Sequence, residues 1–253
     1  MRRADDCLVL TYHSISNEDG PTSIPPAVFA MQMEVLAASG YRSLRIEDFI
    51  AWHEGRLNAE RSVLITFDDG FADFAKVAAP VMSQHGLRAV VFVPTAKIGG
   101  DESWAGIVGP SRKLMNWDDV RSLAAQGFEF GGHSRTHANL VKLDEPTRET
   151  EIAQCKAELT SQLHTPVTSF AAPYGAVDKA TIAAIGRHYD VAFGTRLAVA
   201  QRGDDMHDIP RIDMHYFRNR RHWQGLLDGK NSYLIARQAL RTVRARFMQG
   251  PDA

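Results

Sequence analysis

The 253-residue sequence predicts an α/β fold, an irregular (β/α) barrel of about seven parallel strands, and three observations lead to it. Short apolar runs rich in Val, Ile and Phe alternate with longer helical patterns, which is typical of parallel strands joined by right-handed crossovers. The length suits one barrel of about 250 residues. No Gly-x-Gly-x-x-Gly segment follows the first apolar run, so a doubly wound nucleotide-binding sheet is the poorer choice.

Each element follows from a local pattern. The predicted strands are apolar runs of a few residues, at 8–12, 63–67, 89–93, 128–130, 169–172, 191–193 and 209–212. Apolar residues with helical spacing fill most of the gaps between them, at 27–38, 46–52, 72–84, 117–125, 145–163 and 180–188. Gly86 and Gly127 stand where the third and fourth helices should end, and Pro146 stands in the first turn of the fifth.

The net charge of −1 hides an uneven distribution. Residues 1–217 hold 21 Lys and Arg against 28 Asp and Glu, a balance of −7, and are predicted to form the barrel. Residues 218–253 hold 8 against 2, a balance of +6, and are predicted to form a basic helical segment packed on the same domain.

Within this segment, apolar residues recur at helical spacing, at Ala236, Leu240, Val243 and Phe247, while arginines form another stripe at 237, 241 and 244. Two interpretations stay open. The helix packs on the barrel and exposes a basic face to water, or it attaches the protein to an anionic membrane surface. Nucleic acid is not expected as a partner, because no recognised binding motif accompanies the arginines.

Targeting signals are not evident. The apolar run after the basic N-terminus covers only residues 7–10, whereas a signal peptide needs about 7–15 apolar residues and a small-residue cleavage site. No stretch approaches the roughly 18 apolar residues of a membrane span. We therefore expect a cytoplasmic protein, unless a leader has been removed, and a membrane-peripheral one if the basic segment binds lipid. Cys7 and Cys155 are expected to be reduced packing residues.

Polar residues follow several of the predicted strands. The C-terminal ends of parallel barrel strands converge on one face, where active sites lie. One face should therefore gather these side chains: His13, Asp68, Asp69, His133, His137, Pro173, Tyr174 and Arg211. Each alone has a plainer interpretation, since Asp-Asp-Gly and Pro-Tyr-Gly are common turns and isolated histidines are often core residues. Their shared position at strand ends favours a site.

This set of residue types suits metal-assisted hydrolysis of an amide or ester. Two His and one carboxylate form an open zinc site that leaves a position for water. A second carboxylate beside the metal can take a proton from that water, and a separate His can protonate a leaving amine. Backbone N–H groups at a tight turn can stabilise an oxyanion.

Three segments resemble the main motifs of the NodB-homology polysaccharide deacetylases, carbohydrate esterase family four. They are Thr66-Phe67-Asp68-Asp69-Gly70, His133-Ser134-Arg135-Thr136-His137 and Phe170-Ala171-Ala172-Pro173-Tyr174-Gly175. The resemblance covers roughly residues 7–213 in the expected order. It implies a distorted (β/α) barrel that removes N-acetyl groups, usually from N-acetylhexosamine units of chitin, peptidoglycan or exopolysaccharide.

The resemblance also implies a role for each motif residue. Asp68 would be the general base. Asp69, His133 and His137 would hold one divalent metal, usually Zn²⁺, with Co²⁺, Ni²⁺ or Mn²⁺ as other candidates. The backbone N–H of Tyr174 would face the oxyanion.

Two departures from the family pattern direct attention to other residues. Ala171 stands where the family usually has an Arg that orients the base, and the usual C-terminal Leu-x-x-His motif is not evident. The sequence resembles instead the exopolysaccharide-deacetylase branch, which opens with a Tyr-His-x-Ile strand and takes its acid His from it. His13 is then the acid candidate, and Arg211 the replacement for the missing Arg.

The expected activity is metal-dependent N-deacetylation of a polysaccharide, an oligosaccharide or a lipid-linked sugar, with Pro173, Tyr174 and Trp104 as substrate-binding candidates. An aromatic face such as that of Trp104 can stack on a sugar ring, although packing within its loop is an equal alternative. Two other functions stay open. The chain could be a noncatalytic carbohydrate-binding barrel, which Ala171 motivates, or a deformylase or deacetylase of a small sugar derivative.

Overall fold

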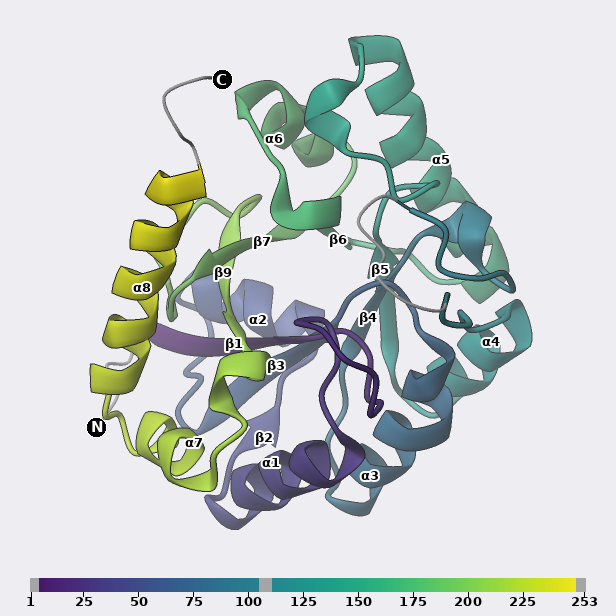
Figure 1. Cartoon of the computed structure of the whole chain (residues 1–253). Coiled ribbons are helices and arrows are strands. Elements are labelled where there is room, and N and C mark those ends of the chain that lie inside the picture. Colours follow the sequence, from purple (N-terminus) through teal and green to yellow (C-terminus); the bar gives the residue numbers. More distant parts are fainter. Residues whose placement is uncertain (1–4, 105–110, 249–253) are drawn as a thin grey trace.

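In the structure, a computed structural model, seven parallel strands close a barrel (Figure 1). The structure describes residues 5–104 and 111–248, with side chains up to residue 242. The barrel strands are β1 (Asp6–Tyr12), β3 (Ser62–Phe67), β4 (Val90–Val93), β5 (Glu129–Gly132), β6 (Ser169–Ala171), β7 (Val191–Leu197) and β9 (Ile209–Asp213). They pair in this order, and β1 pairs in parallel with both β3 and β9, which closes the ring. The predicted barrel is confirmed.

Two further strands are too short to be recognised from an apolar run. β2 (Arg42–Ser43) pairs in parallel with the start of β3, and β8 (Ala200–Gln201) pairs antiparallel with the start of β1. Both lie where the barrel strands begin, so they extend the sheet away from the end that carries the conspicuous polar residues.

Eight helices accompany the strands in the described part of the chain. They are α1 (Pro26–Ala38), α2 (Ile46–His53), α3 (Ala79–Gln84), α4 (Trp117–Ala125), α5 (Glu145–Leu163), α6 (Lys179–Gly186), α7 (Arg220–Leu227) and α8 (Ser232–Met248). The single helix expected at 72–84 is instead a π-helical turn, Phe74–Ala78, followed by α3. Pro80 explains the difference, because it has no N–H to donate to an earlier carbonyl.

The barrel interior is a hydrophobic core of its own. Val9, Leu64, Phe92 and Phe193 point into it from four strands and are buried. The side chains of α2 join the same cluster, and the backbone N–H of Ile46 donates to the Glu129 carboxylate at the first residue of β5. Helix α2 thus covers the end where the strands begin, behind the barrel in Figure 1. The site residues lie at the opposite end.

A second, larger core lies between the sheet and the outer helices, and it includes Cys155. Both cysteines are buried and reduced, as expected. Helix α7 packs on α1, with the Trp223 indole N–H donating to the carbonyl of Gln32 at 2.9 Å. The side chains of Val243, Arg244 and Phe247, which the sequence places on the two stripes of α8, lie outside the described side chains. None of the helices in the described part of the chain has the length and apolar character that a membrane crossing requires.

Candidate active site

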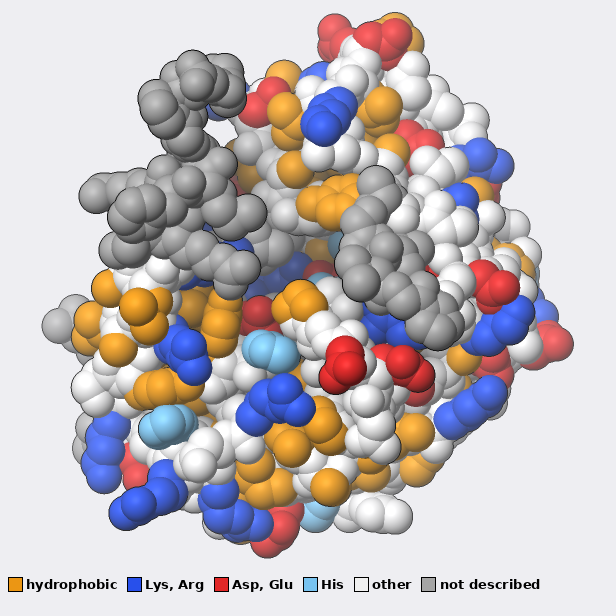
Figure 2. Space-filling view, viewed as in Figure 1, with side chains coloured by type: hydrophobic (Ala, Val, Ile, Leu, Met, Phe, Trp, Pro, Cys, Tyr) orange, Lys and Arg blue, Asp and Glu red, His pale blue; other side chains and the backbone are white. Residues whose placement is uncertain are grey.

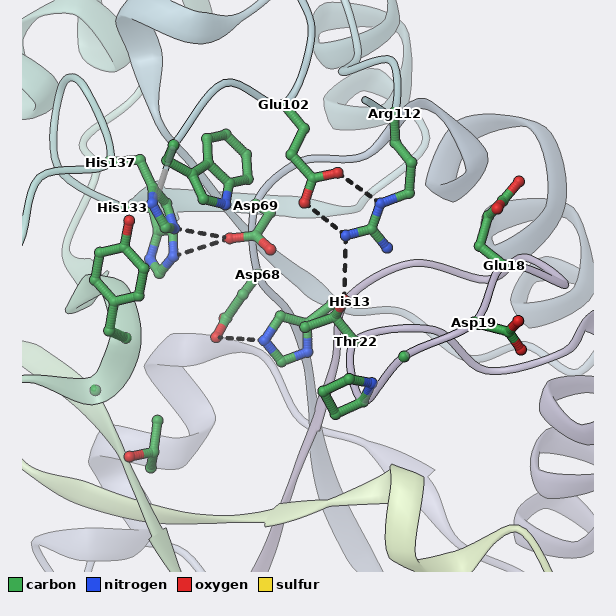
Figure 3. Close-up of a pocket in the computed structure, with 16 residues that line it drawn as sticks. His13, Glu18, Asp19, Thr22, Asp68, Asp69, Glu102, Arg112, His133 and His137 are labelled. Carbon is green, nitrogen blue, oxygen red and sulfur yellow. Dashed lines mark hydrogen bonds and ion pairs between the residues drawn. The ribbon is translucent and has the colours of Figure 1, made fainter. Parts of the chain in front are cut away.

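Residues from the carboxyl ends of the barrel strands surround a cavity of about 380 Å³ (Figure 3). In the space-filling view the cavity is the hollow near the centre of the molecule (Figure 2). Six of the predicted site residues and Trp104 line it, namely His13, Asp68, Asp69, His133, His137 and Tyr174. Arg211 is buried in the barrel below, and Pro173 is buried in the turn after β6. The structure therefore brings most of the predicted set together.

Asp69, His133 and His137 form the group in the described residues that could hold a metal ion. Their candidate ligand atoms all lie within 4.8 Å of one another. The Asp69 Oδ1 atom is 3.3 Å from Nε2 of His133 and 3.1 Å from Nε2 of His137. All three side chains are at least nine-tenths buried, so a cation here would meet three protein ligands and one open side toward the cavity.

The hydrogen bonding of His133 fits a cation at this point. Its Nδ1 lies 2.7 Å from the carbonyl oxygen of Ala171, and because a carbonyl only accepts, Nδ1 carries the proton. In the neutral imidazole the Nε2 lone pair then faces the Asp69 carboxylate, which is favourable only with a positive charge between them. A backbone carbonyl that fixes the tautomer in this way is the usual support of a metal-binding His.

The ionisation of the group points the same way. Burial lowers the pKa of His133, but Asp69 and Asp68 raise it by more, so the net shift is upward. Burial raises the pKa of Asp69, but the two imidazoles hold it well below its ordinary value. Burial is the main reason that the pKa of His137 is lowered. Asp69 is therefore ionised between the two imidazoles, and an ionised carboxylate is the form that binds a cation.

Backbone strain concentrates in the same place. Four non-glycine site residues have positive φ: Asp69 (73°), Ser134 (57°), His137 (62°) and Tyr174 (61°). Such conformations each cost on the order of 1–3 kcal/mol and persist where the surrounding structure imposes them, often at functional sites. Gly70 continues the left-handed turn at φ 71°, where a Cβ would lie 2.8 Å from Val93 Cγ1. The Asp-Asp-Gly turn is therefore shaped to present its carboxylates.

Asp68 is paired with Arg211 inside the barrel. Nη1 and Nη2 of Arg211 donate to the two Asp68 oxygens, each at 2.7 Å, and its Nε donates to the Gly194 carbonyl at 2.8 Å. Arg211 is 1% exposed. Burial raises the pKa of Asp68, but the charge and hydrogen bonds of Arg211 lower it by more, so the net shift is downward. The small side chain of Ala171 belongs to the interior cluster, so the base candidate receives its arginine from β9 and not from β6.

His13 follows β1 directly and faces Asp68 across the cavity (Figure 3). Its Nε2 lies 3.9 Å from Oδ2 of Asp68, and a quarter of its side chain is exposed. The next two residues are anchored to Asp73, which accepts hydrogen bonds from the Ser14 hydroxyl at 2.5 Å and from the Ile15 N–H at 3.0 Å. Asp73 thereby ties the segment that carries His13 to the segment that carries Asp68.

Two aromatic side chains flank His137. The Trp104 ring stacks on its imidazole at 4.1 Å between centroids and 24° between planes, and the Tyr174 ring meets it edge-on at 4.7 Å. Tyr174 is 47% exposed at the mouth of the cavity. One face of Trp104 therefore packs on a site residue, and the predicted sugar contact would use the remainder of the ring. Residues 105–110 of the same connection lie outside the described residues.

The sequence reasoning missed Glu151 on α5. Glu151 is 9% exposed, and its carboxylate accepts three hydrogen bonds from the loop between the two site histidines. The donors are the N–H of Arg135 at 2.9 Å, the N–H of Thr136 at 2.8 Å and the Thr136 hydroxyl at 2.8 Å. A signal existed, because Glu151 adjoins the apolar stripe that Ile152 and Cys155 form on the predicted helix.

Arg112 and Glu102 were missed as well, and they build one wall of the cavity. The Arg112 guanidinium donates to Glu102 at 2.6 and 2.7 Å and to the Thr22 hydroxyl at 3.1 Å (Figure 3). It also donates to the Ser23 hydroxyl at 3.0 Å. It also lies 4.0 Å above the centroid of the Phe71 ring. This pair joins two loops that are distant in the sequence, which no local pattern reveals.

Comparisons with known proteins agree with this geometry. A family model described as polysaccharide deacetylase matches residues 56–190. YxkH of Bacillus subtilis (strain 168), which carries a provisional polysaccharide deacetylase name, is 25% identical over 206 residues, or 81% of this chain and 70% of that protein.

Solved structures share the fold. The Streptococcus pyogenes deacetylase PplD in complex with acetate has a TM-score of 0.73 at 23% identity, covering 82% of this chain and 92% of that one. IcaB from Ammonifex degensii has a TM-score of 0.73 at 22% identity, covering 90% and 98%. The family model matches more than half of the chain, and the motif residues lie together at one end of a seven-stranded barrel. The chain therefore belongs to the NodB-homology polysaccharide deacetylase family.

Proposed function

We propose that the chain is a metal-dependent N-deacetylase that releases acetate from N-acetylhexosamine units of a polysaccharide, an oligosaccharide or a lipid-linked sugar. The observation that carries the proposal is the pair of adjacent carboxylates with different partners. Asp69 faces two imidazoles, and Asp68 faces a buried guanidinium on one side and His13 on the other. These different partners support a role in cation binding for Asp69 and a role in proton transfer for Asp68.

Asp69, His133 and His137 would hold the cation, and Zn²⁺ suits two imidazoles and one carboxylate best. When bound, such a cation polarises the amide carbonyl and lowers the pKa of water to about 7. The downward pKa shift of Asp68 keeps its carboxylate ionised at neutral pH, ready to accept the proton of the attacking water.

The remaining residues complete the hydrolysis. As the water oxygen adds to the acetyl carbon, the backbone N–H of Tyr174 stabilises the oxyanion. His13 then protonates the nitrogen while the C–N bond breaks, so that acetate and a free amino sugar leave. Trp104 and the exposed Tyr174 ring lie at the cavity, where aromatic faces can hold the sugar.

The noncatalytic alternative rests on Ala171 in place of the usual arginine. The bidentate contact between Arg211 and Asp68 supports catalysis instead. It gives the proposed base, Asp68, the guanidinium partner that the family usually takes from the position of Ala171. Acetate release should be measured on a panel of N-acetylated oligosaccharides, polymers and sugar-lipids, with the metal stripped and then restored. Glycan binding without acetate release under Zn²⁺, Co²⁺, Ni²⁺ or Mn²⁺ would favour the carbohydrate-binding barrel.

Removal of the metal is expected to abolish acetate release and to lower stability. A ligand at 100 times its Kd stabilises a protein by about 2.7 kcal/mol, which for this chain length is a rise in Tm of about 5–10 °C. Thermal melts of the chelated protein with and without added Zn²⁺ test this without reference to activity. The rise should be absent from Asp69→Asn. It should also shrink at lower pH, because protons compete for the two histidines.

Glu151→Gln is expected to weaken metal affinity about 10–100-fold, because an amide cannot accept all three hydrogen bonds that position the loop between His133 and His137. Competition with a chelator of known affinity measures this. The matched control is Glu158→Gln on the same helix, where the carboxylate accepts from the side chain of Arg135, at 2.8 Å, and from no backbone N–H of the described residues. Equal affinity in the two variants would mean that Glu151 only supports the fold.

A further inference from the structure

Helix α8 turns the side that carries Tyr233, Leu234 and Gln238 toward the barrel. Leu234 is 3% exposed, the Tyr233 hydroxyl donates to the Tyr216 carbonyl at 3.0 Å, and the Gln238 side chain donates to the Leu197 carbonyl at 2.8 Å. Arg237 donates to the Tyr233 hydroxyl at 2.9 Å. These contacts fix which side of the helix faces the protein.

The apolar stripe of α8 therefore faces outward. We call Ile235, Ala236, Ala239 and Leu240 the outer stripe; all four are exposed, with Ile235 at 60% and Leu240 at 59%. Their spacing places them on one face of the helix. An amphipathic helix of a globular protein normally buries this face. Among the described residues of α8, the side that packs on the barrel and the side that carries the outer stripe are different sides of the helix.

The charge of α8 favours one kind of binding partner for the outer stripe. The helix holds four arginines and no Asp or Glu, within a segment of net charge +6. A second copy of this chain seated on the outer stripe would bring two segments of net charge +6 together, and like charges across an interface cost several kcal/mol. An anionic lipid surface can take up the apolar side chains of the outer stripe, and its negative charge attracts the exposed Arg241 and the basic segment as a whole.

The surface around α8 is also both apolar and basic. In Figure 2, hydrophobic side chains lie over the described part of α8, and Lys and Arg side chains lie beside them around α7. The hollow that holds the candidate site is visible on the same side of the molecule. We propose that the outer stripe of α8 docks the protein on anionic membrane surfaces, without spanning them. This docking does not depend on the proposed deacetylase activity.

Vesicle flotation of the full chain tests the proposal. The protein should float with vesicles that contain phosphatidylglycerol and not with vesicles of phosphatidylcholine alone. Ile235→Ser combined with Leu240→Ser should lower the affinity for phosphatidylglycerol vesicles on the order of tenfold or more, and Arg241→Glu should weaken it and reduce its salt dependence. The matched control changes an exposed apolar residue and a neighbouring cation elsewhere, Val141→Ser with Lys142→Glu, and should float like the unaltered protein.

Thermal melts check that every variant is folded, since all substituted side chains are exposed. Failure of the unaltered protein to float, or equal flotation of the outer-stripe variant, would overturn the proposal. A concentration-dependent dimer that the stripe substitutions abolish, without any vesicle binding, would assign the stripe to self-association instead and would overturn it as well. None of these readouts uses acetate release, so they stand apart from the outcome of the activity assay.

Discussion

Asp68→Asn is expected to lower kcat/KM for acetate release by about 10²–10⁴-fold while the protein keeps its metal. The amide has the shape of the carboxylate but cannot accept the proton of the attacking water. Asp69→Asn should differ in kind, because it removes one of the three ligand atoms and therefore lowers both metal content and activity. Acetate release and metal stoichiometry, measured on both variants, separate the two roles.

Stability must be followed in the same experiment. Asp68→Asn leaves the Arg211 guanidinium buried without its counter-ion, and breaking a buried pair costs about 3–5 kcal/mol. A thermal melt locates the unfolding transition of the variant. An activity assay at a temperature below that transition then shows whether activity is lost in the folded protein. Full activity in Asp68→Asn would remove the general-base assignment, and loss of metal from it would mean that both carboxylates serve the cation.

Arg211→Met is expected to have the second largest effect, through the pKa of Asp68. Without the guanidinium only burial remains as the main influence, so the pKa of Asp68 should rise above its ordinary value. The acid limb of the kcat/KM profile should then move to higher pH, whereas a merely structural loss would lower the profile without moving it. Combining Arg211→Met with Asp68→Asn should recover much of the stability, since the double variant leaves no uncompensated buried charge.

The pH dependence of stability has a definite sign. The folded pKa of Asp68 lies below its unfolded value of about 3.9. The Asp68–Arg211 pair therefore makes its full contribution to the free energy of unfolding above that value. This contribution is lost as the pH falls through the folded pKa. The difference in unfolding free energy between the unaltered protein and Arg211→Met should accordingly shrink in acid. A difference that stays constant from neutral pH to pH 3 would contradict this account.

The strands were predictable because parallel barrel strands are buried on both faces and so form continuous apolar runs, as in β3 and β4. The site histidines and aspartates were predictable because strand ends converge in such a barrel. Arg211 is different. Its position at a strand was visible, but only the closed barrel brings its guanidinium to Asp68, 143 residues earlier in the chain.

Other features depend on tertiary contacts that leave weak local signals. Glu151 sits on a helix whose periodicity says nothing about the loop it binds. The π-helical turn before Pro80 breaks a pattern that otherwise fits an uninterrupted helix. In α8 the spacing of Ala236 and Leu240 establishes a stripe but not its direction, which depends on hydrogen bonds to Tyr216 and Leu197.

Barrel closure gives the site an order of assembly. Asp69 and the two histidines follow β3 and β5, which are joined through β4, so this group can come together early in folding. Arg211 reaches Asp68 only after β9 has paired with β1, a contact between distant parts of the chain that forms slowly. A refolding chain would therefore be expected to bring Asp69, His133 and His137 together before Asp68 acquires its counter-ion.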